Sequence, residues 1–214
     1  MHPSRRLSLL DELLVAADEA LRTLSGLQAS SRALPRASER GEALDAAQAR
    51  EAAALMRINH AGEICAQALY SGQALTAREP RVREALRAAG AEERDHLAWC
   101  RARLRALNGR TSVLDPLWYA GSFGLGVISG MAGDRWSLGF LAETEAQVER
   151  HLDGHLERLP AGDVESRAVL EQMRADEIRH GESGRMLGGA ELPWIVRRAM
   201  QAASKVMTTA AFWV

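Results

Sequence analysis

Two copies of the pattern Glu-x-x-His constrain the fold of this 214-residue chain more than any other feature. Glu93 and His96 form the first copy, and Glu177 and His180 form the second. Residues three apart in a helix lie about one turn apart on the same face, so each copy presents a carboxylate and an imidazole in one direction. The pattern therefore predicts two helices whose functional faces meet.

Hydrophobic periodicity supplies those helices. It predicts four long helices, over about 50–78, 80–107, 135–159 and 163–187. Short links make the first two and the last two antiparallel hairpins, and a long connection over about 108–134 joins the pairs. A four-helix bundle with one long crossover is the ferritin-like topology. The abundance of Ala, Leu, Arg and Glu also favours an all-α fold.

Further helices are expected at both ends of the chain. Residues 1–49 are read as an N-terminal helix over 7–28 and a polar loop over 29–48, whose order the sequence leaves open. The ferritin-like domain then covers 50–214, and its last helix begins near Pro193. The basic start of the chain is soon interrupted by acidic residues, so we expect no signal peptide.

Each hairpin also offers one more glutamate opposite its Glu-x-x-His motif. Glu63 precedes Glu93 by 30 residues, and Glu145 precedes Glu177 by 32. One Glu from each of two helices and one Glu-x-x-His from each of the other two is the ligand set of di-iron carboxylate bundles. Oxygen-rich ligands with one imidazole per metal suit iron or manganese. We therefore expect two metal ions bound by Glu63, Glu93, His96, Glu145, Glu177 and His180.

Within this set, Glu93 and Glu177 are expected to bridge the metals. Glu145 has a competitor in Glu149, one turn further along the same face. His151 is expected either to contact a metal ligand from outside the site or to be an ordinary surface histidine. Other acidic neighbours are expected to face solvent or to contact the ligands from outside: Glu92, Glu143, Glu149 and Glu182. A single Glu-x-x-His usually marks a solvated helix face, but two copies with matching partners are hard to reach by accident.

A family resemblance rests on four segments. They are Arg57–Glu63 (Arg-Ile-Asn-His-Ala-Gly-Glu) with the following residues to Gln73, and the stretches 92–97, 144–152 and 176–180. Over about residues 50–212 the chain resembles the demethoxyubiquinone hydroxylases of ubiquinone biosynthesis, and all six ligand positions of that family are filled.

The resemblance implies a monooxygenase with two iron ions that hydroxylates the ring of demethoxyubiquinol with O2 to give demethylubiquinol. The irons must be reduced again, by the quinol itself or by NADH by way of the quinone, and the sequence does not choose. A ferroxidase or a rubrerythrin-type peroxidase is the runner-up. A helical scaffold without metal is a third reading, but it would bury six ionisable groups without compensation.

Three residues near Glu63 are further candidates. His60 and Arg57 lie one and two turns before it, and Tyr70 lies two turns after it. His60 is expected to hydrogen-bond a ligand carboxylate, and Tyr70 to line the substrate pocket. For all three, packing as polar residues near the end of the bundle is the alternative.

A polyprenyl quinol resides in the bilayer, so the resemblance also implies peripheral contact with the cytoplasmic face of the bacterial cell membrane. Two segments suit this contact. Residues 116–133 are uncharged and Gly-rich but slightly short for a span. Residues 193–214 form a basic amphipathic helix that ends near Phe-Trp, although the same face would suit packing against the bundle or a second copy.

Other ubiquinone-biosynthesis proteins are expected as partners. Nucleic acid is not, because the net charge is only -1.

Overall fold

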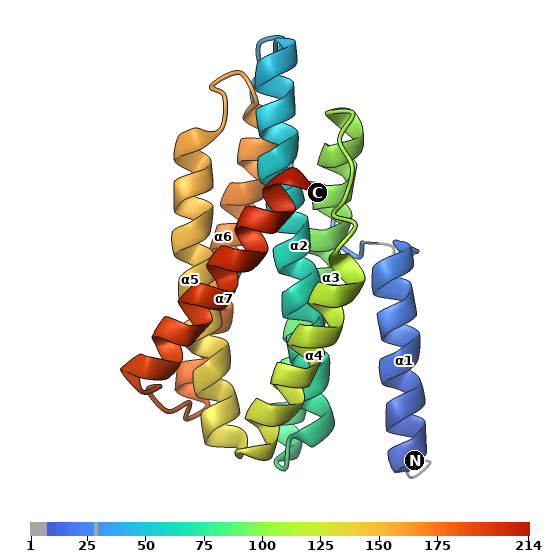
Figure 1. Cartoon of the computed structure of the whole chain (residues 1–214), viewed down its shortest axis with the longest axis vertical. Helices are drawn as coiled ribbons and strands as arrows, with labels where there is room; N and C mark the ends of the chain where they lie inside the picture. The colour runs from blue at the N-terminus through green and yellow to red at the C-terminus, as the bar shows by residue number, and fades with distance from the viewer. Residues whose placement is uncertain (1–7, 28–29) are drawn as a thin grey trace.

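Seven helices and no strand occur in the residues that the structure describes, 8–27 and 30–214 of a computed structural model (Figure 1). The helices are α1 Leu9–Ser25, α2 Ala46–Thr76, α3 Pro80–Ala106, α4 Asp115–Met131, α5 Asp134–Arg158, α6 Val164–Met186 and α7 Trp194–Trp213. The predicted all-α, ferritin-like architecture with additional terminal helices is confirmed.

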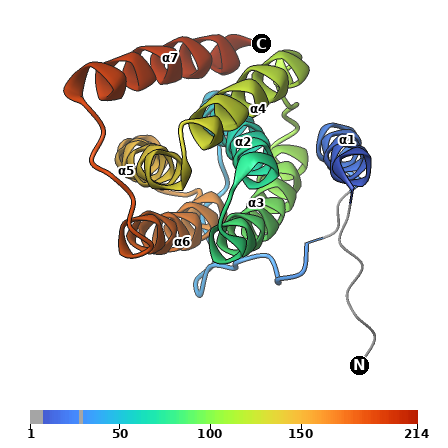
Figure 2. The same cartoon turned by 90° about the horizontal axis from the view of Figure 1, so that it is seen from below.

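Helices α2, α3, α5 and α6 form the four-helix bundle, with α2 against α3 and α5 against α6 (Figure 2). Helix α2 begins at Ala46, four residues earlier than the pattern predicts, because Asp45 and Gln48 form a capping box. Asp163 caps α6 and also binds Arg103 of α3, at 2.8 Å. A hydrophobic core packs between the bundle helices and includes Leu55, Met56, Trp99, Leu170 and Met173.

The long crossover contains α4, which packs along the outside of α2 (Figure 2). The sequence predicts membrane contact for this segment but no helix; the structure shows α4 over Asp115–Met131. Two glycines let the backbones touch. A Cβ on Gly126 would lie 2.3 Å from the carbonyl oxygen of Leu69, and one on Gly72 would lie 2.4 Å from that of Phe123. Both positions therefore need glycine for packing.

The polar segment before α2 is ordered, a question that the sequence left open. We call residues 30–44 the strap, because they run across the bundle from the end of α1 to α2. The Ser30 hydroxyl and the Ser31 amide donate to the buried carboxylate of Asp95 on α3, at 2.9 and 2.6 Å. The start of the chain through position 7, and positions 28 and 29 at the end of the predicted first helix and the start of the loop, lie outside the described residues.

Helix α7 crosses α5 and reaches α2 (Figures 1 and 2). Its end is fixed by Arg57, whose guanidinium donates to the carbonyl oxygens of Ala211, at 2.7 Å, and Phe212, at 2.5 Å. A cation at the C-terminal end of a helix satisfies its free carbonyls and complements its dipole. Of the two readings of Arg57, the structure thus supports the packing role.

Replacing Gly126 tests the close approach of α4 to α2. Gly126→Ala should lower the free energy of unfolding by about 1–3 kcal/mol, because the methyl group would collide with the α2 backbone. Gly124→Ala is the matched control, since its Cβ meets no atom within 4 Å. The control should gain about 0.5–1 kcal/mol from its higher helix propensity. Urea denaturation of the two variants measures both, and equal stabilities would contradict the packing argument.

Candidate metal centre

Six side chains from four helices converge in the interior of the bundle. Glu63 comes from α2, Glu145 from α5, and the two Glu-x-x-His motifs come from α3 and α6. The six side chains are all buried, and His180, at 6% exposure, is the most accessible. They form two overlapping groups whose ligand atoms lie within 4.8 Å of one another: Glu63, Glu93, His96 and Glu177, and Glu145, Glu177 and His180.

The centre of the cluster belongs to Glu93 and Glu177. The Nδ1 atom of His96 lies 3.0 Å from Glu93 and 3.1 Å from Glu177. The Nδ1 atom of His180 lies 3.2 Å from each of them. These two carboxylates therefore face both imidazoles, which is the position that bridging ligands need. The bridging role itself stays a prediction.

Burial and mutual repulsion shape the charges of the glutamates. Burial and the charge of Glu93 raise the pKa of Glu63 well above its usual range, and burial and the charge of Glu177 do the same to Glu145. Burial would also raise the pKa of Glu93, but the charge of His96 and the hydrogen bond to His180 hold it well below its usual value. Burial and the charge of Glu93 would raise the pKa of Glu177 too, but hydrogen bonds from His180 and His96 lower it.

The histidines show the complementary effect. Burial alone would lower the pKa of His96, but the charge of Glu93 and the hydrogen bond to Asp176 raise it well above its ordinary value. Burial opposes the charge on His180 too, yet hydrogen bonds to Glu177 and Glu93 raise its pKa to about 11. Without metal, the raised pKa values of His96, His180, Glu63 and Glu145 favour their protonated forms, which lowers the net negative charge of the cluster.

The residues present fit a pair of divalent cations. Among the described residues, one buried oxygen of each of the four glutamates lacks a well-aligned hydrogen bond. For Glu63, Glu93 and Glu177 that oxygen lies 3.1–3.4 Å from a histidine Nδ1. Such atoms are costly to bury unless something binds them. Two divalent ions would bind these oxygens, displace the protons and neutralise four carboxylates. One imidazole for each ion and otherwise oxygen is a donor set suited to iron or manganese.

Two acidic residues support the histidines from outside the cluster. The Nε2 atom of His96 lies 3.0 Å from the Asp176 carboxylate, and that of His180 lies 3.5 Å from Glu92. Each acid immediately precedes the glutamate of one motif and faces the histidine of the other. Outer carboxylates of this kind fix the orientation of a ligand histidine. Asp176 was missed, although its place before Glu177, matching that of Glu92 before Glu93, was a usable signal.

Arg32 of the strap is the second residue that sequence reasoning missed. Its guanidinium lies 2.7 Å from the buried Asp176 carboxylate and stacks over the Trp99 ring, 4.8 Å from the ring centroid. Arg179 binds the same carboxylate and also Glu92, at 3.1 Å. The strap was read as a polar loop, and no periodic pattern in it points to α6, so only the tertiary structure reveals this contact.

The remaining sequence candidates lie elsewhere. His60 faces Asp115 of α4, with 3.3 Å between Nδ1 and the carboxylate, so the predicted hydrogen bond to a ligand carboxylate is wrong. His151 packs edge-on against His155 and does not contact a ligand residue. The Nδ1 atom of His155 in turn lies 2.9 Å from the Asn59 side chain. His60 thus lies in a contact between α2 and α4, and His151 contacts His155 one turn away on α5, so neither reaches the ligands.

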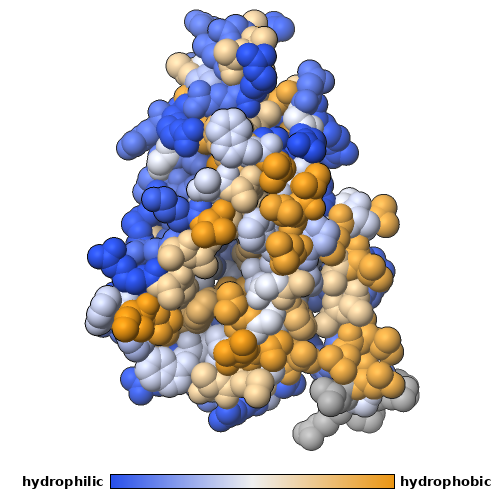
Figure 3. Space-filling view, in the orientation of Figure 1, coloured by the Kyte–Doolittle hydropathy of each residue, from blue (hydrophilic) through white to orange (hydrophobic). Residues whose placement is uncertain are grey.

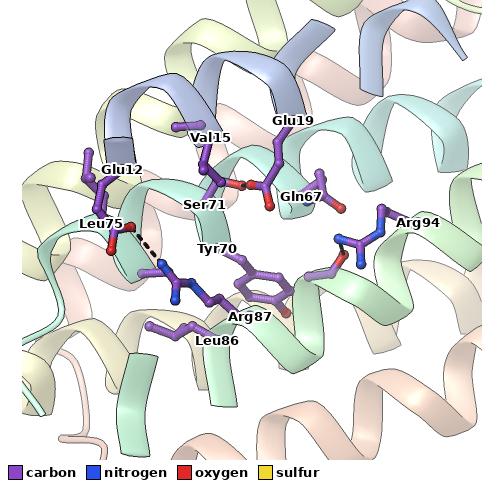
Figure 4. Close-up of a pocket in the computed structure, with 13 residues that line it drawn as sticks. Glu12, Val15, Glu19, Gln67, Tyr70, Ser71, Leu75, Leu86, Arg87 and Arg94 are labelled. Atoms are coloured by element: carbon purple, nitrogen blue, oxygen red, sulfur yellow. Dashed lines mark hydrogen bonds and ion pairs between the residues drawn. The ribbon is translucent and has the colours of Figure 1, made fainter. Parts of the chain in front are cut away.

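Tyr70 contacts the ligand cluster and also lines a small pocket. Its buried hydroxyl donates to the Glu145 carboxylate. Its ring also lines a pocket of about 30 Å³ between α1, α2 and α3, beside the Arg87–Glu12 ion pair (Figure 4). That volume holds one or two waters and no aromatic ring. Tyr70 therefore orients Glu145 and does not line a substrate-sized pocket here.

The competing glutamates are separated by burial. Glu145 points into the cluster, whereas Glu149 is half-buried at the surface, 3.7 Å from Arg174. Glu143 is half-buried beside Gln147, and Glu182 is exposed. Of the expected outer contacts, only that of Glu92 reaches a ligand histidine.

Arg32 should act as a positioning residue for the centre. Arg32→Gln leaves the buried Asp176 with one fewer cation and loosens His96, so the affinity for metal should fall about 10–100-fold. Arg36→Gln, at an exposed arginine of the same strap, should leave it unchanged. Titration of the metal-free chain against a chromogenic chelator measures both, and Arg32→Lys should recover part of the loss. Equal affinities would contradict the positioning role.

The comparisons with known proteins agree with this site. Residues 50–211 match the family model described as ubiquinone biosynthesis protein COQ7. A relative from Ralstonia pickettii is 53% identical over 215 residues, covering 95% of this chain and 99% of its own length. One from Cupriavidus taiwanensis is 57% identical over 205 residues, with coverage of 95% and 99%. One from an Azoarcus species is 55% identical over 206 residues, with coverage of 96% and 100%.

All three relatives bear the name 3-demethoxyubiquinol 3-hydroxylase. The family match covers the four bundle helices and with them all six residues of the cluster. The chain belongs to the COQ7 family of ubiquinone biosynthesis proteins.

Proposed function

We propose that this chain is a monooxygenase that adds one oxygen atom from O2 to the ring of demethoxyubiquinol and so gives demethylubiquinol, a late step of ubiquinone biosynthesis. The observation that carries the proposal is the buried, duplicated set of one Glu and one Glu-x-x-His in a member of this family. The names of its relatives give the substrate class and the reaction.

The proposed cofactor is a pair of iron ions. Glu63, Glu93, His96 and Glu177 would hold one, and Glu145, His180 and the two central carboxylates the other. Reduced iron supplies the electrons that activate O2. The protein keeps bulk water away from the centre and fixes its histidines through Asp176 and Glu92. Whether NADH or the quinol restores the reduced state stays open.

The ferroxidase and peroxidase alternatives are less well supported. Rubrerythrin-type proteins usually add a CxxC iron site, whereas the two cysteines of this chain are Cys65 and Cys100, far apart in sequence. The relatives across nearly the full length are hydroxylases by name. A metal-free scaffold would have to bury four carboxylates whose charge only protons and the two histidines offset, which is costly.

Membrane contact is part of the proposal. Exposed apolar side chains gather over α4 and α1 and at the start of α7 (Figure 3). They include Leu117, Leu125, Ile128 and Met131 of α4, Trp194 and Ile195 of α7, and Leu10, Leu13 and Leu14 of α1. Patches of this kind on a monomer commonly mark interaction surfaces. Arg197, Arg198 and Lys205 of α7 add positive charge suited to anionic lipids.

We assign this surface to peripheral binding on the cytoplasmic face of the bacterial cell membrane. Across residues 8–27 and 30–214, none of the helices has the length and apolar character to cross a bilayer. Helix α1 adds exposed leucines to the two segments that the sequence analysis named, and hydrophobic surface over α1 and α4 is visible on the same face of the molecule (Figure 3). Contact with other proteins of the pathway stays a prediction.

A single charge on α7 tests the membrane contact. Ile195→Glu places a carboxylate on an exposed apolar position and should weaken flotation with anionic vesicles several-fold. Gln201→Glu adds the same charge at an exposed polar position of α7 and should have a much smaller effect. If both variants float like the unmodified chain, Ile128→Glu on α4 tests the other segment. Unchanged binding of all three would overturn membrane contact through these helices.

The proposed reaction is tested with labelled oxygen. The iron-loaded chain receives a short-tailed demethoxyquinone, NADH and oxygen-18 gas, and the product is read by mass spectrometry. One heavy oxygen atom on a new ring hydroxyl group is expected. The control, Glu177→Gln, should lose both iron and product, because it removes a central ligand of both groups. Oxygen consumption without a hydroxylated ring would instead favour the ferroxidase or peroxidase reading.

A further inference from the structure

The two halves of the metal centre differ in how their histidines are covered. His96 is fully buried, and its outer nitrogen pairs with Asp176, which Arg32 of the strap and Arg179 hold in place. On the other half, the outer nitrogen of His180 is also buried, but it has no hydrogen bond among the described residues, and Glu92 stays 3.5 Å away. Arg32 also reaches Glu92, at 3.6 Å. The two sides therefore differ in that the outer nitrogen of His96 is paired, whereas that of His180 has only a long contact with Glu92.

His180 also lines a cavity. The cavity has a volume of about 180 Å³ and lies between α3, α5 and α6. Its walls are mainly apolar, from Leu86, Ala89, Leu138, Leu141 and Leu187. Its polar groups include His180 together with Glu92 and Arg179. Apolar walls with a few convergent polar groups are the usual construction of a site for a small organic ligand.

The volume limits what can enter. An apolar cavity of about 150 Å³ in a protein interior is enough to bind benzene. The space here accepts one substituted six-membered ring but no isoprenoid chain. A long tail attached to the ring must leave through the mouth of the cavity. Leu187 lines that cavity, and its neighbour Met186 is 87% exposed, so a departing tail stays beside apolar surface.

The polar groups fit ring hydroxyls. The Glu92 carboxylate accepts hydrogen bonds, and the Arg179 guanidinium donates them. A quinol ring carries hydroxyl groups that both donate and accept, on an apolar body. The pocket at Tyr70, at about 30 Å³, offers no comparable space.

We propose that the cavity between α3, α5 and α6 binds the ring of the quinol, with a ring hydroxyl against the Glu92 carboxylate and the Arg179 guanidinium. The inference rests on the proposed function for the identity of the ring, and it adds where the ring lies. It makes the His180 side the substrate side of the centre.

Filling the cavity tests this assignment. Ala89→Leu extends a side chain into the space, whereas Ala91→Leu makes the same change on α3 outside the lining. The full chain, loaded with ferrous iron without oxygen, is titrated calorimetrically with a demethoxyquinol that carries one isoprene unit. Ala89→Leu should weaken binding at least tenfold and raise KM. Ala91→Leu should bind like the unmodified chain, and both should retain their iron.

Several outcomes would overturn the proposal. It fails if Ala89→Leu is folded, holds iron and binds the quinol normally, or if the unmodified chain does not bind the quinol. If Ala89→Leu does not fold, Ser183→Leu, at an exposed lining position, replaces it under the same criteria. Binding that depends on the cavity without any hydroxylated product would sustain the site and refute the proposed reaction. If the unmodified chain forms the hydroxylated product but both cavity variants bind the quinol as well as it does, the proposed reaction holds and the cavity assignment fails.

Discussion

The repulsion among four buried carboxylates is the constraint on which the rest of the structure depends. Glu63, Glu93, Glu145 and Glu177 lie in an interior where each charge raises the energy of the others. In the metal-free chain, protons on the histidines and on the outer two glutamates offset this charge. Two divalent ions would do so without protons, so the binding of metal and the stability of the bundle are expected to be coupled.

This constraint explains why the surroundings of the centre are so polar. Asp176 and Glu92 hold the outer nitrogens of the histidines, and arginines in turn hold these acids. The arrangement repeats across the two Glu-x-x-His motifs, and the strap adds Arg32, whose guanidinium lies 2.7 Å from Asp176 and 3.6 Å from Glu92. The two sides differ because His96 is fully buried, whereas His180 lines the cavity between α3, α5 and α6. An approximate symmetry of ligands thus becomes a centre whose two sides differ in access.

The additional helices extend the bundle on another side. Helix α4 touches α2 backbone to backbone through Gly72 and Gly126, and Arg57 holds the end of α7 against α2. With these contacts made, much of the apolar surface of α4 and α7 has no partner among the described residues. The glycine-rich crossover therefore serves packing on one face, while its other face is free for the proposed contact with lipid (Figure 3).

The sequence by itself determined the four bundle helices, the hairpin pairing and the six residues that the fold brings together. It could do so because helical periodicity and the Glu-x-x-His spacing are local properties of the chain. Only the tertiary structure decided the partners of His60, Arg57 and Arg32, and that Glu145 rather than Glu149 enters the cluster. Each of those outcomes depends on contacts between segments far apart in sequence, and no local pattern encodes which distant side chain will share a buried space.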